Sequence, residues 1–232
     1  MSQNGFKLGV VMLATRFPRP LGDIGNPESH GLPVEFLVAP AATTSSVVSA
    51  HAIPTDVVDS FIEAAKTLVD RGCHGITTSC GFACGIHDEL QAALPVPIVS
   101  SSLNLVPHLA SRFGTNTPLP VITYDSQVLS KYHFGRFWAP NVVVQGIEKS
   151  GELYTVIKGD KEILDASLAE RGVLESVEKA LSRYPTSKAI LLECTNLPPY
   201  RQAIEKYFGL PVFDIFSALE TLFDRPGFRN FV

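Results

Sequence analysis

Two cysteines, Cys80 and Cys194, stand in matching frames and are the residues whose type and placement best suit catalysis. Each follows a short apolar run typical of a β-strand and precedes a segment with helical spacing. A proline, Pro97 or Pro211, follows each cysteine after the same interval of 17 residues, between apolar residues that would open another strand. The sequence therefore predicts that one strand–cysteine–helix–strand unit occurs twice.

Two thiols that reach one ligand from opposite sides suit proton exchange at a carbon beside a carboxylate. A thiolate takes the proton as base on one face, a thiol returns one as acid on the other, and the roles reverse in the opposite direction. The unpaired N–H groups at the first turn of a helix lower a thiol's pKa and bind carboxylate oxygens. Gly81 would allow the backbone close approach to a ligand, and Thr195 and Asn196 add side-chain hydrogen-bonding groups. This chemistry requires no cofactor and no metal.

Alternating strand-like and helix-like segments must position these thiols, and they predict an α/β fold with parallel sheets. The apolar runs predict strands at residues 6–14, 34–40, 75–78, 98–99, 119–124, 142–147, 189–192 and 212–215. Helical spacing and capping residues predict helices at residues 54–71, 81–94, 103–113, 126–137, 160–184, 199–208 and 217–223.

The repeated unit predicts two pseudo-symmetric Rossmann-like lobes with a cleft between them. We expect residues 1–104 together with 213–232 to form the first α/β lobe, which carries Cys80, and residues 105–212 to form the second, which carries Cys194. Ligands of open parallel sheets bind beyond the carboxyl ends of the strands, where both cysteines stand. The cleft is therefore the expected site.

The segments Thr-Ser-Cys-Gly-Phe around Cys80 and Glu-Cys-Thr-Asn-Leu-Pro around Cys194 resemble the two catalytic motifs of the aspartate/glutamate racemase superfamily. That group includes hydantoin racemases, maleate isomerases and arylmalonate decarboxylases, and the resemblance covers nearly the whole chain. It implies cofactor-independent proton transfer by the two cysteines. It also implies substrate contacts at Gly81, Phe82, Tyr124 and Thr195.

Other features refine this expectation. Arg16 follows the first strand, where its guanidinium could meet a ligand carboxylate. Glutamate racemases usually have Asn-Thr where this chain has Gly81-Phe82, often a histidine where Asn196 stands, and an Asp-Ser pair after the first strand where this chain has Ala14-Thr15-Arg16. These departures argue against glutamate as the substrate.

The expected function is that of an isomerase, a cofactor-independent racemase or epimerase of an amino acid or related small carboxylate. One alternative is an enzyme of the same fold with different chemistry, like a maleate isomerase or a decarboxylase. The other is a non-catalytic module that binds small carboxylates, because two lobes around a cleft also suit ligand capture.

The composition of the 232 residues limits the partners. Only 18 % of residues are charged and 45 % are hydrophobic, which makes a homodimer plausible. A basic tract that would bind nucleic acid is absent from the sequence, as is an apolar run long enough to span a membrane. We expect a cytoplasmic protein with reduced thiols. Cys84 and His87 lack the second ligand pair of a zinc site, so we expect Cys73 and Cys84 to be packing residues.

Overall fold

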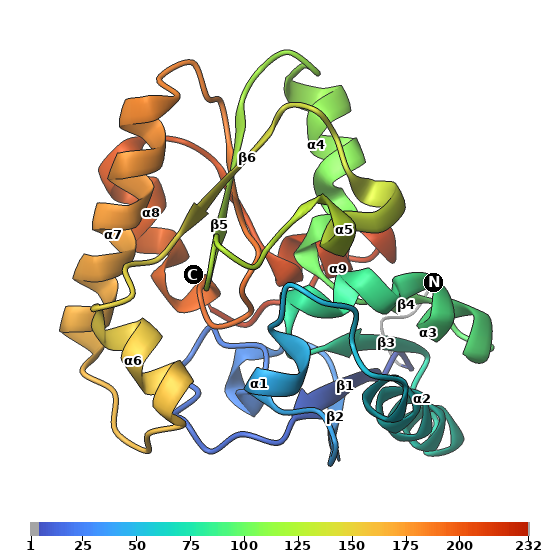
Figure 1. The fold of residues 1–232 in the computed structure, drawn as a ribbon. Helices are drawn as coiled ribbons and strands as arrows, with labels where there is room; N and C mark the ends of the chain where they lie inside the picture. Colours follow the sequence, from blue (N-terminus) through green and yellow to red (C-terminus); the bar gives the residue numbers. More distant parts are fainter. Residues whose placement is uncertain (1–4, 232) are drawn as a thin grey trace.

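Two four-stranded parallel sheets organise residues 5–231, which the computed structural model describes (Figure 1). The strand orders are β2-β1-β3-β4 and β6-β5-β7-β8. The strands are β1 (Leu8–Leu13), β2 (Val34–Ala39), β3 (Gly75–Thr78), β4 (Ile98–Val99), β5 (Leu119–Thr123), β6 (Val142–Gly146), β7 (Ile190–Leu192) and β8 (Val212–Phe213). The α/β fold class with parallel sheets is thereby confirmed.

Helices flank both sheets. They are α1 (Thr44–Val47), α2 (Thr55–Asp70), α3 (His87–Ala93), α4 (Val106–Phe113), α5 (Lys131–Phe134), α6 (Glu152–Gly159), α7 (Ala166–Arg183), α8 (Arg201–Phe208) and α9 (Ile215–Leu222). Short 3₁₀ turns join them, among them η2 (Gly81–Ile86), η3 (Ser102–Leu105) and η5 (Pro198–Tyr200). In Figure 1, α7 and α8 lie along one side of the second sheet and α4 and α5 along the other.

The central strands β1, β3, β5 and β7 are almost wholly buried because both of their faces are covered, as is typical of parallel sheets. Every residue of β3, β5 and β7 is buried. On β7, Leu191 packs into the core shared with the first sheet, whereas Ile190 and Leu192 pack into a second core beside α7 and α8. Burial on both faces fixes the strand ends, and with them the cysteines that follow.

The predicted repeat is visible in the register of the strands. Ile76 of β3 pairs with Ile98 of β4, and at the same distance from the second cysteine Ile190 of β7 pairs with Val212 of β8. The residues just before the cysteines correspond as well. The N–H of Ser79 donates to the Val11 carbonyl of β1 (2.9 Å), and the N–H of Glu193 donates to the Ile122 carbonyl of β5 (2.8 Å).

Several predicted helices are wrong in extent. The helix expected at residues 160–184 begins only at Ala166, after the Asp165 cap. The helix α6 before it was not predicted, and it ends where Asp160 adopts a left-handed backbone (φ 46°). Of residues 126–137, only α5 and one 3₁₀ turn, Gly135–Phe137, are helical. The last strand ends at Phe213 because the Asp214 side chain caps α9 by accepting the Ser217 N–H.

The C-terminal segment returns to the first sheet. Helix α9 contacts η3 and β4 as well as β8, and Arg229 forms an antiparallel bridge with His30. The exact lobe limits at residues 104 and 212 stay a prediction. Within residues 5–231, no helix is both long and apolar enough to cross a membrane, and no group of three or more His, Cys, Asp or Glu side chains is placed to hold a metal ion.

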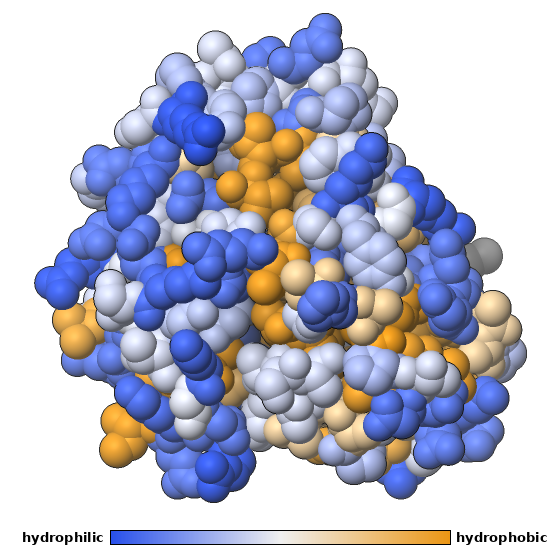
Figure 2. Space-filling view, viewed as in Figure 1, coloured by the Kyte–Doolittle hydropathy of each residue, from blue (hydrophilic) through white to orange (hydrophobic). Residues whose placement is uncertain are grey.

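Apolar residues gather along the middle of the face seen in Figure 2, between more hydrophilic margins. Large hydrophobic side chains that are exposed elsewhere, such as Ile163 and Tyr207, lie apart along the chain. The homodimer stays a prediction.

Candidate active site

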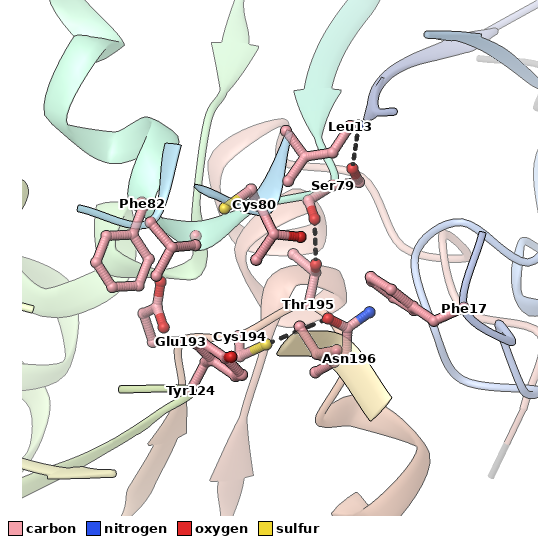
Figure 3. A pocket seen from close by; sticks show the side chains of 14 residues that line it. Leu13, Phe17, Ser79, Cys80, Phe82, Tyr124, Glu193, Cys194, Thr195 and Asn196 are labelled. Carbon is pink, nitrogen blue, oxygen red and sulfur yellow. Dashed lines mark hydrogen bonds between the residues drawn. The ribbon is translucent and has the colours of Figure 1, made fainter. Parts of the chain in front are cut away.

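A cavity of about 350 Å³ lies where the turns that follow β3 and β7 meet. Both cysteines line the cavity (Figure 3). All but one of the other predicted site residues line it too: Gly81, Phe82, Tyr124, Thr195 and Asn196.

Cys80 follows β3 directly and is the N-cap of η2. Its side chain is buried, and burial together with the nearby Glu193 carboxylate raises the pKa of the thiol to about 12. The backbone N–H groups of Phe82 and Ala83 act in the opposite direction because they stabilise a thiolate. Cys80 is therefore a thiol at rest, with donors already placed for its ionised form.

Cys194 lies in a different local setting. Three residues separate it from η5, so it does not stand at the first turn of a helix, which is where the sequence predicted it. Its Sγ–H donates to Asn196 Oδ1 (3.4 Å), and burial, followed by the charge of Glu193, raises the thiol's pKa well above its ordinary value. This thiol is held as a hydrogen-bond donor.

Asn196 is fixed by a buried polar chain that leads away from the cavity. Its Nδ2 donates to Asp23 Oδ2 (2.6 Å), and Arg19 donates to the other carboxylate oxygen of Asp23 (3.1 Å). Asp23 is fully buried. Because the amide nitrogen is committed to Asp23, the Asn196 carbonyl oxygen faces Cys194. The loop that contains Asp23 thus orients the second thiol.

The two turns that carry the cysteines also bind each other. The Thr195 hydroxyl donates to the Ser79 carbonyl (2.7 Å), and the Ser102 hydroxyl donates to the Leu192 carbonyl (2.8 Å). The Ser79 hydroxyl in turn accepts the Leu13 N–H at the end of β1 (2.9 Å). These buried bonds hold the thiols in a fixed relation, as an active site requires.

Glu193 is a buried acid that the sequence reasoning did not single out. Its side chain is 1 % exposed, its Oε2 accepts a hydrogen bond from the Thr123 hydroxyl (2.6 Å), and burial raises its pKa to about 7. Its Oε1 has no hydrogen-bond partner among residues 5–231. A charged residue in an otherwise apolar strand end was the available signal, since such residues are rarely buried without a function.

Gly81 is explained by this acid. A Cβ at Gly81 would overlap both the carboxylate and the backbone carbonyl of Glu193. The sequence reasoning expected the glycine to admit a ligand, whereas in the structure it admits Glu193 to the wall of the cavity.

Aromatic rings form much of the remaining wall. Phe82 and Phe17 lie toward opposite sides of the view in Figure 3, with the two cysteines between them. The Tyr124 ring stacks on Tyr154 (4.5 Å between centroids), and burial raises the pKa of Tyr124 above its ordinary value. Phe17 was missed by the sequence reasoning because only the folded loop brings it to the cavity.

Arg16 does not line the cavity. Its side chain is 71 % exposed and forms ion pairs with Asp160 (3.1 Å) and Glu162 (3.6 Å). The backbone N–H groups of Arg16 and Phe17 also donate to Asp160. Arg16 thus anchors its loop to the end of α6.

The chain was compared with known proteins by sequence and by structure. No family model matches the chain. A dimethylsulfoniopropionate lyase from Durusdinium sp. clade D is 30 % identical over 233 residues, which cover 95 % of this chain and 76 % of that protein. Dimethylsulfoniopropionate lyase 7 from Emiliania huxleyi (strain CCMP1516) is 29 % identical over 239 residues, which cover 95 % of this chain and 68 % of that protein.

Solved structures share the fold at lower identity. A Gly74Cys mutant of arylmalonate decarboxylase matches with a TM-score of 0.63 at 15 % identity, over 96 % of this chain and 97 % of that chain. Allantoin racemase from Klebsiella pneumoniae gives 0.62 at 18 % identity, over 95 % and 86 %. Glutamate racemase from Francisella tularensis, solved with D-glutamate, gives 0.59 at 15 % identity, over 95 % and 80 %. The resemblance to the aspartate/glutamate racemase superfamily is confirmed at the level of the fold.

The expected reaction is wrong. Relatives that align with nearly the whole chain are lyases, so the prediction of an isomerase that racemises or epimerises an amino acid is overturned. The alternative of a maleate-isomerase-like or decarboxylase-like enzyme of the same fold comes closer, because a decarboxylase is also a lyase. By its sequence, this chain belongs to the dimethylsulfoniopropionate lyase family.

Proposed function

We propose that this chain is a lyase that cleaves dimethylsulfoniopropionate or a closely related 3-substituted propionate. The observation that carries the proposal is that two thiols, the buried Cys80 and the partly buried Cys194, line one cavity in a chain of this family. Elimination and racemisation begin with the same step, the removal of a proton from the carbon beside a carboxylate. A racemase-like fold therefore suits a lyase if the leaving group is on the carbon next to the one that loses the proton.

The reaction balances without an outside reagent. A thiolate takes a proton from the carbon beside the carboxylate, and the electron pair of that C–H bond becomes the carbon–carbon double bond. The bond between the next carbon and the sulfonium sulfur breaks, and its electrons stay on sulfur. The products are acrylate and neutral dimethyl sulfide, and the thiol later returns its proton to solvent.

We assign the base to Cys80. Two backbone N–H groups, those of Phe82 and Ala83, support its thiolate, whereas Cys194 has one such donor, the N–H of Asn196, and its Sγ–H donates to the Asn196 side-chain oxygen. Cys194 then acts as a donor to the substrate, with the backbone N–H groups of Thr195 and Asn196 beside it to hold the carboxylate. Hydrogen bonds that strengthen as charge moves onto the carboxylate would lower the barrier.

The test is to incubate purified protein with dimethylsulfoniopropionate and measure dimethyl sulfide by gas chromatography and acrylate by NMR. Equal amounts of both products are expected. Cys80→Ser should lower kcat/KM by about 10²–10⁴-fold, the usual contribution of a general base. Cys73→Ser is the matched control, because Cys73 is buried outside the cavity and should leave the rate nearly unchanged.

Absence of both products with folded protein would reject the proposed reaction. Equal losses in Cys80→Ser and Cys73→Ser would reject the assignment of the base.

A further inference from the structure

The cavity wall has an acidic side chain and no basic one. Among the described residues that line the cavity, Glu193 alone has a carboxyl side chain, and none is a lysine, arginine or histidine. The nearby Arg19 lies over the Phe17 ring (4.4 Å) and is paired with Asp23 (3.1 Å), so its charge is already matched. A ligand that enters this cavity meets an acid with no basic partner.

Glu193 also breaks the pseudo-symmetry of the site. Ser79 and Glu193 occupy equivalent places, each between its strand and its cysteine, and each donates its N–H to the equivalent strand of its sheet. The hydroxyl of Ser79 is used within the fold, where it accepts the Leu13 N–H. The Glu193 carboxylate instead lines the cavity with Oε1 unpaired among residues 5–231. The two thiols occupy equivalent positions, but only the second has a carboxyl group beside it in the chain.

A buried carboxylate without a positive partner is costly, and fold stability alone does not explain its place. The surrounding wall is aromatic and aliphatic, including Phe82, Tyr124 and Leu13. Apolar walls around a single anion match a cation whose charge is covered by alkyl groups, since such a cation is weakly hydrated, donates no conventional hydrogen bonds and is attracted to ring faces. A Lys-like ammonium would instead need several acceptors.

We propose that Glu193 binds the positively charged end of the substrate and selects an alkylated onium group over a neutral group of the same shape. This inference rests on the proposed function, in which the onium is the sulfonium leaving group. The ligand then lies with its cation toward Glu193 and Phe82 and its carboxylate toward Thr195 and Asn196. Figure 3 shows Glu193 and Asn196 on different sides of Cys194.

The same contact prepares the base. The ionised Glu193 disfavours a second negative charge on Cys80 and on Cys194, and it is the second cause of the raised pKa of each thiol after burial. A cation bound beside Glu193 offsets that repulsion, so the Cys80 thiolate forms more readily when the charged substrate is present. A neutral ligand gives no such help.

The experiment compares two inert ligands that differ in charge alone: 3-(trimethylammonio)propanoate and its carbon isostere 4,4-dimethylpentanoate. Dissociation constants are measured by calorimetry for the wild type, Glu193→Gln and Glu193→Asp. We expect the wild type to prefer the cation by about 10–100-fold, which corresponds to about 1.4–2.8 kcal/mol. In Glu193→Gln this preference should fall to about one, with binding of the neutral isostere changed less than about twofold. Glu193→Asp should restore part of the preference.

Binding of the neutral isostere reports that each variant is folded, and the wild-type preference needs no variant at all. Equal affinity of the wild type for both ligands, or equal weakening of both by Glu193→Gln, would overturn the inference. Failure of the proposed function looks different: the wild type would prefer the cation yet release no dimethyl sulfide from dimethylsulfoniopropionate.

Discussion

Replacing Gly81 by alanine tests whether the close contact between the two cysteine turns controls the site. Gly81 is the first residue of η2 and follows Cys80. An added Cβ would overlap both the side-chain Oε1 and the main-chain oxygen of Glu193. The side chain has room to rotate only by giving up its Thr123 hydrogen bond, and the carbonyl oxygen is fixed by the end of β7. Cys80 and the η2 turn must therefore move.

Gly85 is the matched control in the same 3₁₀ turn. A Cβ there meets its nearest heavy atom, His133 Cα, at 3.7 Å, which is an ordinary van der Waals contact. Overpacking costs about 1–3 kcal/mol. A glycine-to-alanine change without strain stabilises by about 0.4–1 kcal/mol. The free energies of unfolding of Gly81→Ala and Gly85→Ala should therefore differ by about 1.5–4 kcal/mol.

Urea unfolding of both variants measures this difference directly. At about 2–4 °C per kcal/mol for a chain of this size, the melting temperatures should differ by about 3–16 °C. We also expect Gly81→Ala to lose at least about tenfold in the rate of dimethyl sulfide release, because the Cys80 sulfur and the Glu193 carboxylate are displaced. Equal stability and equal activity of the two variants would refute the packing argument.

Two further outcomes follow from the buried polar groups. Burial raises the pKa of the Cys80, Cys84 and Cys194 thiols, so the folded chain keeps protons that the unfolded chain loses above about pH 8.5. The free energy of unfolding should then fall as pH rises from 8.5 toward 11, by up to about 1.4 kcal/mol per pH unit for each thiol. Urea titrations at pH 7.5 and 9.5 measure this change. Equal free energies of unfolding at the two pH values would contradict it. Asp23→Asn should destabilise the fold by about 3 kcal/mol and slow turnover, because its new amide hydrogens would face the Asn196 donor. Differential scanning calorimetry measures the stability and the product assay measures the turnover. Wild-type values of both would exclude a role for the hydrogen bonds that join Asn196 to Asp23.

Local regularities in the sequence predicted which strand ends meet at the candidate site. Apolar runs that end at a cysteine marked β3 and β7, and the matching prolines placed β4 and β8 beside them. Such patterns are readable because strands covered on both faces must be apolar throughout. The helices were predicted less well. The helix expected from residue 160 begins only at Ala166, and Asp160 instead accepts N–H groups from Arg16 and Phe17, far away in the sequence.

The reaction was misjudged for a related reason. Racemisation and elimination both begin with removal of a proton from the carbon beside a carboxylate. The motifs around Cys80 and Cys194 indicate that step alone. What distinguishes the reactions is the part of the cavity that holds the rest of the substrate. Glu193 and Phe17 line the cavity beside the cysteines, and neither stands out in the sequence by its spacing.

The sequence alone determined the parallel α/β architecture, the repeated unit and the pair of thiols at strand ends, because each is encoded in contiguous residues through periodicity and strand burial. The tertiary structure decided which side chains share the cavity. Arg16 lies at the surface beside Asp160, whereas Phe17 and Glu193 line the cavity. Such placements arise from contacts between segments far apart in the chain, and the electrostatics of the cavity follow from how those segments pack.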